Sequence, residues 1–231
     1  MSPTREQGER TRRRIVEKAA PIFNTKGYFG TSMSDLVRET GLEKGGIYGH
    51  FAGKEELAVA SFEYAAGVMR ERFASELAGK EGALEKLFAV IDVLSGMVED
   101  PPVEGGCPIL NTAVESDDTN PVLKQKAKEA MDGWLRLVGS ITKAGVRSGE
   151  LAPEIDPRET ASVVMGALEG ALMLTKLCDD PEHMRRAVAH LKGRLGALQR
   201  DGGTAVAVAK GSSGGACSAP QKSTRQGHGR E

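Results

Sequence analysis

The sequence contains few aromatic residues and few cysteines. One Trp, three Tyr and six Phe occur among 231 residues, so aliphatic side chains and alanine must provide most of the packing in any core. The three cysteines, at positions 107, 178 and 217, form no CxxC pair and no spacing typical of metal ligands. Their odd number, without a secretion signal, indicates a reducing cytoplasm. We therefore expect no disulfide framework, no metal site and no cofactor.

The chain also lacks a long uncharged apolar run. No such run approaches the ~20 residues that span a membrane. The arginines near the N-terminus precede no apolar segment of the kind found in a secretion signal. We therefore expect a cytoplasmic protein without a membrane partner.

No catalytic constellation is visible. The four histidines are scattered, at positions 50, 183, 190 and 228. Glu115, Asp117 and Asp118 fit a loop at a helix end better than a cation site. Catalysis requires titrating groups that meet in a defined geometry. The sequence therefore predicts that the protein is not an enzyme, which leaves catalysis as the remote alternative.

Charge is distributed unevenly along the chain, although the net charge is only −1. Residues 1–54 carry ten Lys and Arg against six Asp and Glu, whereas the remainder carries 21 against 26. A basic end on an acidic body suits a protein that contacts phosphates at one end only. Chance asymmetry is the alternative. A nucleoid-type structural binder would need basic charge throughout, which the acidic body argues against.

The most informative segment is residues 11–57, TRRRIVEKAAPIFNTKGYFGTSMSDLVRETGLEKGGIYGHFAGKEEL. Gly27 is placed to end a first helix in a left-handed conformation. Thr31, Ser32 and Ser34 are N-cap candidates for a second helix that ends near residue 40. After a glycine turn, a short third helix is expected over residues 44–51, and a longer helix follows. This order predicts a helix-turn-helix unit, whose second helix enters the major groove of DNA.

This segment resembles the DNA-binding domain of the TetR family of transcriptional regulators. The matching residues are Phe23, Gly27, Tyr28, Thr31, Ser32, Asp35, Leu36, Gly41, Leu42, Lys44, Gly45, Ile47, Tyr48, His50, Phe51, Lys54, Glu55, Glu56 and Leu57. The resemblance implies a homodimer that binds double-stranded operator DNA through two such heads. It also implies a C-terminal pocket for a small-molecule effector that loosens DNA binding. Beyond the head, the chain resembles the family only in being helical.

Apolar residues recur at helical spacing throughout the rest of the chain, and no strand pattern appears. We therefore expect an all-α fold, with a three-helix DNA-binding head followed by a helical bundle for ligand binding and dimerisation. The expected boundaries are a mobile arm at 1–9, the helix-turn-helix domain at 10–56 and the helical domain at 57–200. Residues 201–231 are rich in Gly, Ser and Ala, and we expect a disordered tail there.

The candidate DNA contacts are small, polar or basic residues of the head. They are Thr31, Ser32, Lys44, Gly45, Gly46, Tyr48, His50 and Lys54. Hydroxyls and N–H groups at a helix start suit phosphates, and the glycines allow close approach. Each side chain has a structural alternative: Tyr48 against the first helix, His50 as a helix cap, Lys54 as a solvated charge. Glu43 and Gly49 depart from the family pattern, which places the cap of the third helix in doubt.

The candidate effector pocket combines large apolar residues from separate helices with one cysteine and one amide. Its members are Phe88, Met97, Cys107, Leu110, Asn111, Trp134, Met165 and Leu168. Such a pocket would take an apolar or aromatic molecule, and a closed core is the alternative.

Cys107 precedes Pro108 and is expected to start a short helix, where the pKa of a thiol is lowered. The sequence Gly-Gly-Cys-Pro-Ile-Leu-Asn resembles a subgroup of the family that senses electrophiles or oxidants. The main prediction is a repressor released by a small apolar or electrophilic molecule. The alternative is a sensor that acts through Cys107 alone, and a small buried hydrophobe is the structural alternative.

The candidate dimer interface combines a small-residue face with the last amphipathic helix. Its members are Gly166, Gly170, Met184, Val188, Leu191 and Leu195. Small residues on one helix face permit close approach, so two copies would form a four-helix interface. Packing within one subunit is the alternative.

Overall fold

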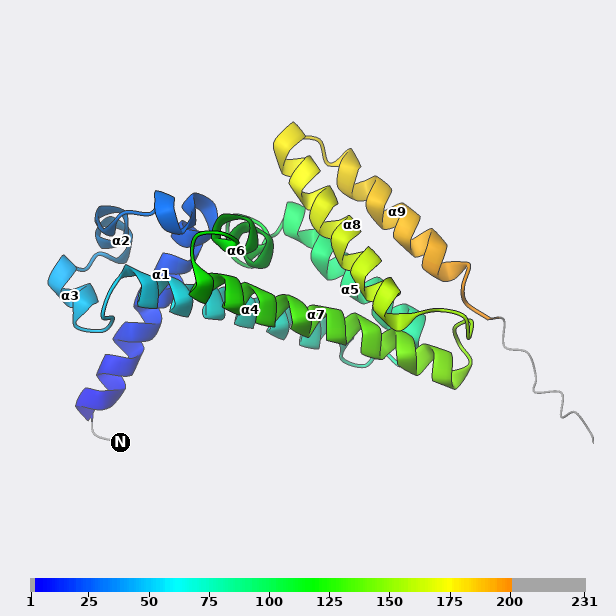
Figure 1. Cartoon of the computed structure of the whole chain (residues 1–231). Coiled ribbons are helices and arrows are strands. Elements are labelled where there is room, and N and C mark those ends of the chain that lie inside the picture. Colours follow the sequence, from blue (N-terminus) through cyan, green and yellow to red (C-terminus); the bar gives the residue numbers. More distant parts are fainter. Residues whose placement is uncertain (1–2, 201–231) are drawn as a thin grey trace, which may run out of the picture. The chain divides into compact units, whose positions relative to one another are not determined.

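The computed structural model describes residues 3–200 of the chain, and within that range it is all-α, as predicted (Figure 1). The helices in chain order are α1 (Pro3–Gly30), α2 (Met33–Thr40), α3 (Lys44–Tyr48), α4 (Lys54–Leu77), α5 (Ala83–Ser95), the 3₁₀ helix η1 (Gly96–Val98), α6 (Pro108–Ser116), α7 (Pro121–Ser148), α8 (Pro157–Cys178) and α9 (Glu182–Gly196). The predicted disordered tail, 201–231, lies outside the described residues.

Helix α1 begins earlier than the sequence suggested. Residues 3–9 are helical, so the prediction of a separate arm is wrong for them. Proline is well tolerated in the first turn of a helix, and an Arg5–Glu9 ion pair joins successive turns. Gly27 interrupts α1 as expected, with φ 74° and ψ 172°, and one further turn follows it.

The head is built from α1, α2, α3 and the start of α4. Its core consists of Ile15, Val16, Ala19, Leu36, Ile47, Phe51 and Leu57. Helix α2 carries a full capping box, in which Ser32 and Asp35 bond each other's backbone N–H groups. Gly41 ends α2 with a left-handed φ of 69°. Helix α3 ends at Tyr48 and not at Phe51. Gly45 and Gly46 lie within this helix and Gly49 follows it, and glycine has poor helix propensity.

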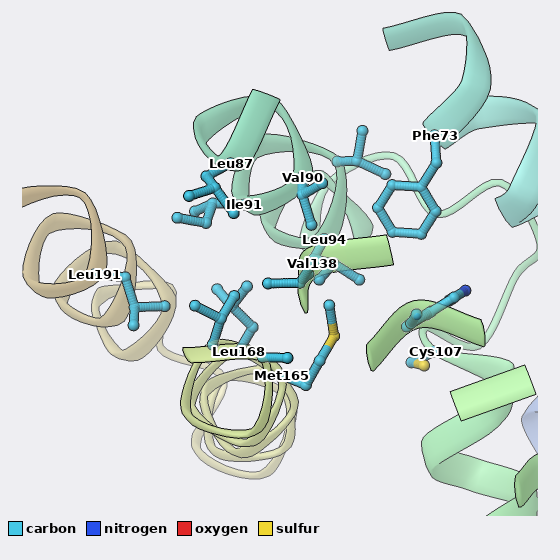
Figure 2. Close-up of a cluster of buried hydrophobic side chains, with 14 of the residues drawn as sticks. Phe73, Leu87, Val90, Ile91, Leu94, Cys107, Val138, Met165, Leu168 and Leu191 are labelled. Carbon is cyan, nitrogen blue, oxygen red and sulfur yellow. The ribbon is translucent and has the colours of Figure 1, made fainter. Parts of the chain in front are cut away.

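The body consists of α4 to α9 around one aliphatic cluster. Helix α8 packs against α7 and α9, and α5 packs against α4 and α7 (Figure 1). Figure 2 shows side chains from several of these helices converging, including Leu94, Val138, Met165, Leu168 and Leu191. By length and composition alone α8 would pass for a membrane span, but 44% of its most apolar window is buried inside this fold.

Candidate DNA interface and effector site

The exposed face of α3 is the candidate DNA interface. Ile47 points into the head core, whereas Lys44, Gly45, Gly46 and Tyr48 face solvent. Tyr48 is 44% exposed, and the Lys44 ammonium lies 5.8 Å from the centre of its ring. A cation, a phenol and two positions without side chains thus lie together on one short helix, which suits a phosphate-lined groove.

The N-terminus of α3 has no side-chain cap. Glu43 occupies the cap position, yet its carboxylate makes no capping hydrogen bond. The departure noted in the sequence therefore has the structural effect that was expected, and the free N–H groups of α3 keep their hydrogen-bonding capacity.

Thr31 and Lys54 are engaged inside the head, and their predicted roles need correction. Thr31 is only 1% exposed, and its hydroxyl donates to the Gly27 carbonyl at 2.6 Å, so it is not available to a phosphate. The Lys54 ammonium donates to the carbonyls of Tyr28 and Thr31 at 2.7 and 3.0 Å. It also lies 4.3 Å from the Tyr28 ring centre. Lys54 therefore ties the start of α4 to the end of α1.

Ser32 and His50 are less constrained. The Ser32 hydroxyl is exposed, but it exchanges hydrogen bonds with Asp35 at 2.6 and 3.1 Å. His50 is half-buried in the turn after α3. Hydrogen bonds from Lys26 and then from Ser32 and Arg38 hold the pKa of Asp35 well below its usual range. This carboxylate is the charged centre of the α2 cap.

Asn24, which the sequence analysis missed, and Asn111, which it assigned to the effector pocket, join the head to the body. Asn24 of α1 donates through Nδ2 to the carbonyls of Val103, Glu104 and Gly106, at 3.5, 2.9 and 3.0 Å. Asn111 of α6 donates to the backbone and side-chain oxygens of Asn24, at 2.9 and 3.0 Å. Asn24 thus holds the loop before α6. Its only signal in the sequence is an amide inside an otherwise apolar helix face.

Glu115 forms the second joint. Its carboxylate accepts the N–H groups of Tyr28 and Phe29 at 2.6 and 2.9 Å. A Cβ atom on Gly27 would lie 2.5 Å from a Glu115 oxygen, so this approach requires glycine at position 27. The charge-assisted bonds connect α6 directly to the last turn of α1.

The predicted effector residues separate into two groups. Met97, Trp134, Met165 and Leu168 are buried members of the body core, and Phe88 is half-buried under the Lys192 ammonium, 5.5 Å from its ring centre. For Met97, Met165 and Leu168 the closed-core alternative therefore describes the structure, whereas Trp134 also lines a cavity of about 460 Å³ between α4 and α7. The remaining three, Cys107, Leu110 and Asn111, line a cavity of about 590 Å³ with residues of α1 and α8.

Cys107 is not an activated thiol. It is 1% exposed, at the edge of the aliphatic cluster in Figure 2, and it donates a hydrogen bond to Glu169 Oε1 at 3.0 Å. Burial, reinforced by the Glu169 carboxyl group, raises the pKa of Cys107 above its ordinary value. The N–H groups at the start of α6 act in the opposite direction but are outweighed. The prediction of a lowered pKa is therefore wrong, while sensing through Cys107 alone stays a prediction that rests on the resemblance.

The predicted dimer residues also separate. Met184, Leu191 and Leu195 belong to the core of their own subunit, so their assignment to a dimer interface is corrected. Val188 is half-buried against that core. Gly166 is exposed and Gly170 half-buried, with open space around both. They share a face of α8 with four exposed apolar side chains: Val163, Met173, Leu174 and Leu177.

Comparison with known proteins identifies both regions. Residues 15–60 match the family of bacterial regulatory proteins described as the tetR family, and residues 83–191 match the tetracyclin repressor-like C-terminal domain. The chain is 27% identical over 156 residues to the fatty acid metabolism regulator protein of Bacillus subtilis, covering 67% of this chain and 78% of that protein.

Two solved structures agree over most of the chain. A TetR transcriptional regulator from Chloroflexus aurantiacus is 43% identical, with a TM-score of 0.81, and covers 84% of this chain and 98% of its own. A TetR-family regulator from Cytophaga hutchinsonii is 33% identical, with a TM-score of 0.77 and the same coverage. The head, the helical body and these relatives together show that the chain belongs to the TetR family of ligand-responsive transcriptional regulators, which are not enzymes.

Proposed function

We propose that the chain is a homodimeric, cytoplasmic repressor that binds operator DNA through α3 and releases it when a small molecule occupies the body. The observation that carries the DNA role is the separation of faces on α3. Ile47 anchors the helix, while Lys44 and Tyr48 project from it unburied. Lys44 is free of ion pairs among residues 3–200, so its ammonium is available to a phosphate or a base edge.

Dimerisation is proposed through the exposed face of α8. Val163 and Leu174 are exposed apolar side chains, and Gly166 and Gly170 between them leave room for a second helix. An isologous pairing of two such faces would remove this apolar surface from water and place two heads in one molecule. This arrangement retains the two glycines of the original prediction and replaces its core leucines.

Effector binding is proposed in the body, next to the joints that hold the head. The cavity near Cys107 is suited to this role because α1, α6 and α8 all contribute to its wall. A ligand there would contact residues on both sides of the Asn24 and Glu115 joints. A displacement of α6 or of the loop before it would act on α1 through the hydrogen bonds of Asn24 and Glu115.

A binding titration tests the DNA role. Fluorescence anisotropy would follow binding of the protein to duplex DNA from the promoter region upstream of its own coding sequence, at several salt concentrations. Lys44→Ala should weaken binding by about 1–3 kcal/mol if Lys44 reads a base, or lower the salt dependence by about one counterion if it meets a phosphate.

Lys143→Ala, an exposed lysine on α7, is the control and should leave affinity unchanged. Equal affinities for wild type and Lys44→Ala at every salt concentration would refute the role of Lys44. A protein that stays monomeric and binds no such duplex at low salt would refute the proposed function.

A further inference from the structure

The cavity between α1, α6 and α8 has an apolar wall and a cationic edge. Leu110 and Val114 come from α6, and Leu172, Met173 and Leu177 come from α8. At about 590 Å³, its volume lies within the range of small-molecule sites. Helix α6 packs beside the end of α1 (Figure 1), so the cavity adjoins the joints of the head.

Two lysines line this cavity, and they differ in what they bind. Lys26 is paired with Asp35 at 2.7 Å. Lys176 forms no ion pair within residues 3–200, and its ammonium donates to the carbonyl oxygen of Gly105. A carboxylate is a stronger partner for an ammonium than a neutral carbonyl. Lys176 is thus a cation whose present partner an anion would displace.

Glu115 is the acid that lines this cavity, and both of its oxygens are turned to the backbone N–H groups of Tyr28 and Phe29. Glu169 lies behind Cys107, is 7% exposed, and burial raises its pKa, which favours the neutral acid. Among the described residues that line the cavity, Lys176 is therefore the lysine without an acidic partner.

Gly105 belongs to the loop that holds the head. Its carbonyl accepts from Lys176 and from Asn111 Nδ2, the latter at 3.1 Å. The neighbouring carbonyls of Glu104 and Gly106 hold Asn24 of α1. Gly105 has φ 112°, and a Cβ atom on it would lie 2.7 Å from the Asn24 carbonyl oxygen. Any partner that takes Lys176 from Gly105 thus removes one of the contacts that fix this loop.

We infer that the cavity binds an amphipathic monoanion, with its apolar body against α6 and α8 and its carboxylate on Lys176. Binding exchanges the Gly105 carbonyl for the ligand carboxylate at the Lys176 ammonium. The loop at 103–106 then loosens its hold on Asn24, and the head loses the orientation in which α3 meets DNA. This inference deepens the proposed function, because the release step assumes that the head binds an operator.

The ligand site is tested without DNA, by isothermal titration calorimetry of the full chain. The three probes each carry a ten-carbon chain and are used at concentrations at which they do not aggregate. Sodium decanoate should bind, whereas decan-1-ol and decyltrimethylammonium should bind more weakly by about tenfold or more. Lys176→Met retains most of the apolar stem and should reduce decanoate affinity by about tenfold or more.

Lys176→Arg preserves the charge and should retain decanoate binding. Lys143→Met removes a lysine from a different cavity, between α7 and α8, and should match wild type. Failure of decanoate to bind, equal binding of the alcohol and the carboxylate, or unchanged affinity in Lys176→Met would each overturn the inference.

The coupling is tested by Gly105→Ala, which disturbs the Asn24 contact and leaves Lys176 in place. This variant should bind decanoate at least as tightly as wild type, because the competing Gly105 contact is weakened, and it should bind operator DNA weakly with or without decanoate. Wild-type DNA affinity and wild-type release in Gly105→Ala would overturn the coupling. If no duplex binds wild type while decanoate binding still requires Lys176, the proposed function fails and the ligand site stands.

Discussion

The head and the body of this protein divide their residues in different ways. In the head, core and contact residues are distinct: Ile47 is buried, and Lys44 and Tyr48 on the same short helix are exposed. In the body, several large apolar residues that looked like a ligand pocket belong to the core, as Met97 and Met165 show. Exposed polar residues on a short helix can be recognised by residue type, whereas pocket and core residues of an aliphatic bundle are of the same type.

The two regions also differ in what holds them together. Each has its own apolar cluster. At their junction a small third cluster of Ala20, Ala65 and Val103 is buried, and Asn24, Asn111 and Glu115 add hydrogen bonds at the end of α1. Hydrogen bonds weaken steeply with poor geometry. A small movement of α6 or of the loop before it would therefore weaken the polar contacts of the junction.

Removing one phenylalanine from each core should give the largest effects. Phe51→Ala in the head and Phe73→Ala in the body each remove a buried ring, at an expected cost of about 3–5 kcal/mol in the free energy of unfolding. The Phe51→Ala variant also loses the contact with the Arg12 guanidinium, which lies 4.5 Å from the centre of the Phe51 ring.

Hydrogen exchange resolved along the chain would separate the two regions. Phe51→Ala should accelerate exchange in α1 to α3 first, and Phe73→Ala in α4, α5 and α7. Uniform acceleration by both variants would mean that head and body unfold as one cooperative unit, which would contradict two independent cores.

Breaking the junction should have the next largest effect. Glu115→Ala leaves the N–H groups of Tyr28 and Phe29 without their charged acceptor, at an expected cost of about 1.5–3 kcal/mol. Thermal unfolding and DNA-binding anisotropy should both report the loss. Asp117→Ala, two residues on and exposed, is the control, and a loss of similar size in that variant would show that the effect is not specific to the junction.

The two helix caps of the head should respond in opposite directions. Ser32→Ala removes the capping box of α2 and should cost about 1 kcal/mol of stability. Glu43→Ser offers α3 the side-chain cap that it lacks and should add roughly 0.5–1 kcal/mol. Urea unfolding of both variants measures the difference, and a loss of stability in Glu43→Ser would indicate that the cap position is constrained by other contacts.

The smallest effect is expected from pH at Glu169. Burial raises the pKa of this carboxyl group, and the hydrogen bond from Cys107 partly offsets that shift. An acid whose pKa is raised in the folded state binds its proton more tightly there. The free energy of unfolding therefore falls as pH rises from the ordinary glutamate pKa through the folded value. Glu169→Gln stays neutral, and the difference between its unfolding free energy and that of wild type should therefore grow over this pH window. A constant difference would mean that Glu169 titrates as it does in the unfolded chain.

The fold of the head was largely predictable because its signals are local. The cap at Ser32, the turn at Gly41 and the break at Gly27 depend on residues a few positions apart. Lys54 was misassigned for the same reason: nothing local shows that its ammonium reaches the carbonyl of Tyr28.

The cavity near Cys107 and the junction were not predictable because the residues that meet there are distant in sequence. Asn24 meets Asn111, and Cys107 meets Glu169, only after the helices pack. A polar residue within an apolar face is visible in the sequence, but its partner is a property of the tertiary structure. The pKa of Cys107 illustrates this, since burial outweighs the helix start that the sequence reveals.

Trp134 is the single tryptophan of the chain, and it lies edge-on to Phe73 with ring centres 5.3 Å apart. Ultraviolet emission excited at tryptophan wavelengths therefore arises wholly from the body, while the head contributes no indole signal. Trp134 is therefore an intrinsic fluorescence probe of the body. A change in its emission when operator DNA is added would report a change in the body that is caused by binding at the head.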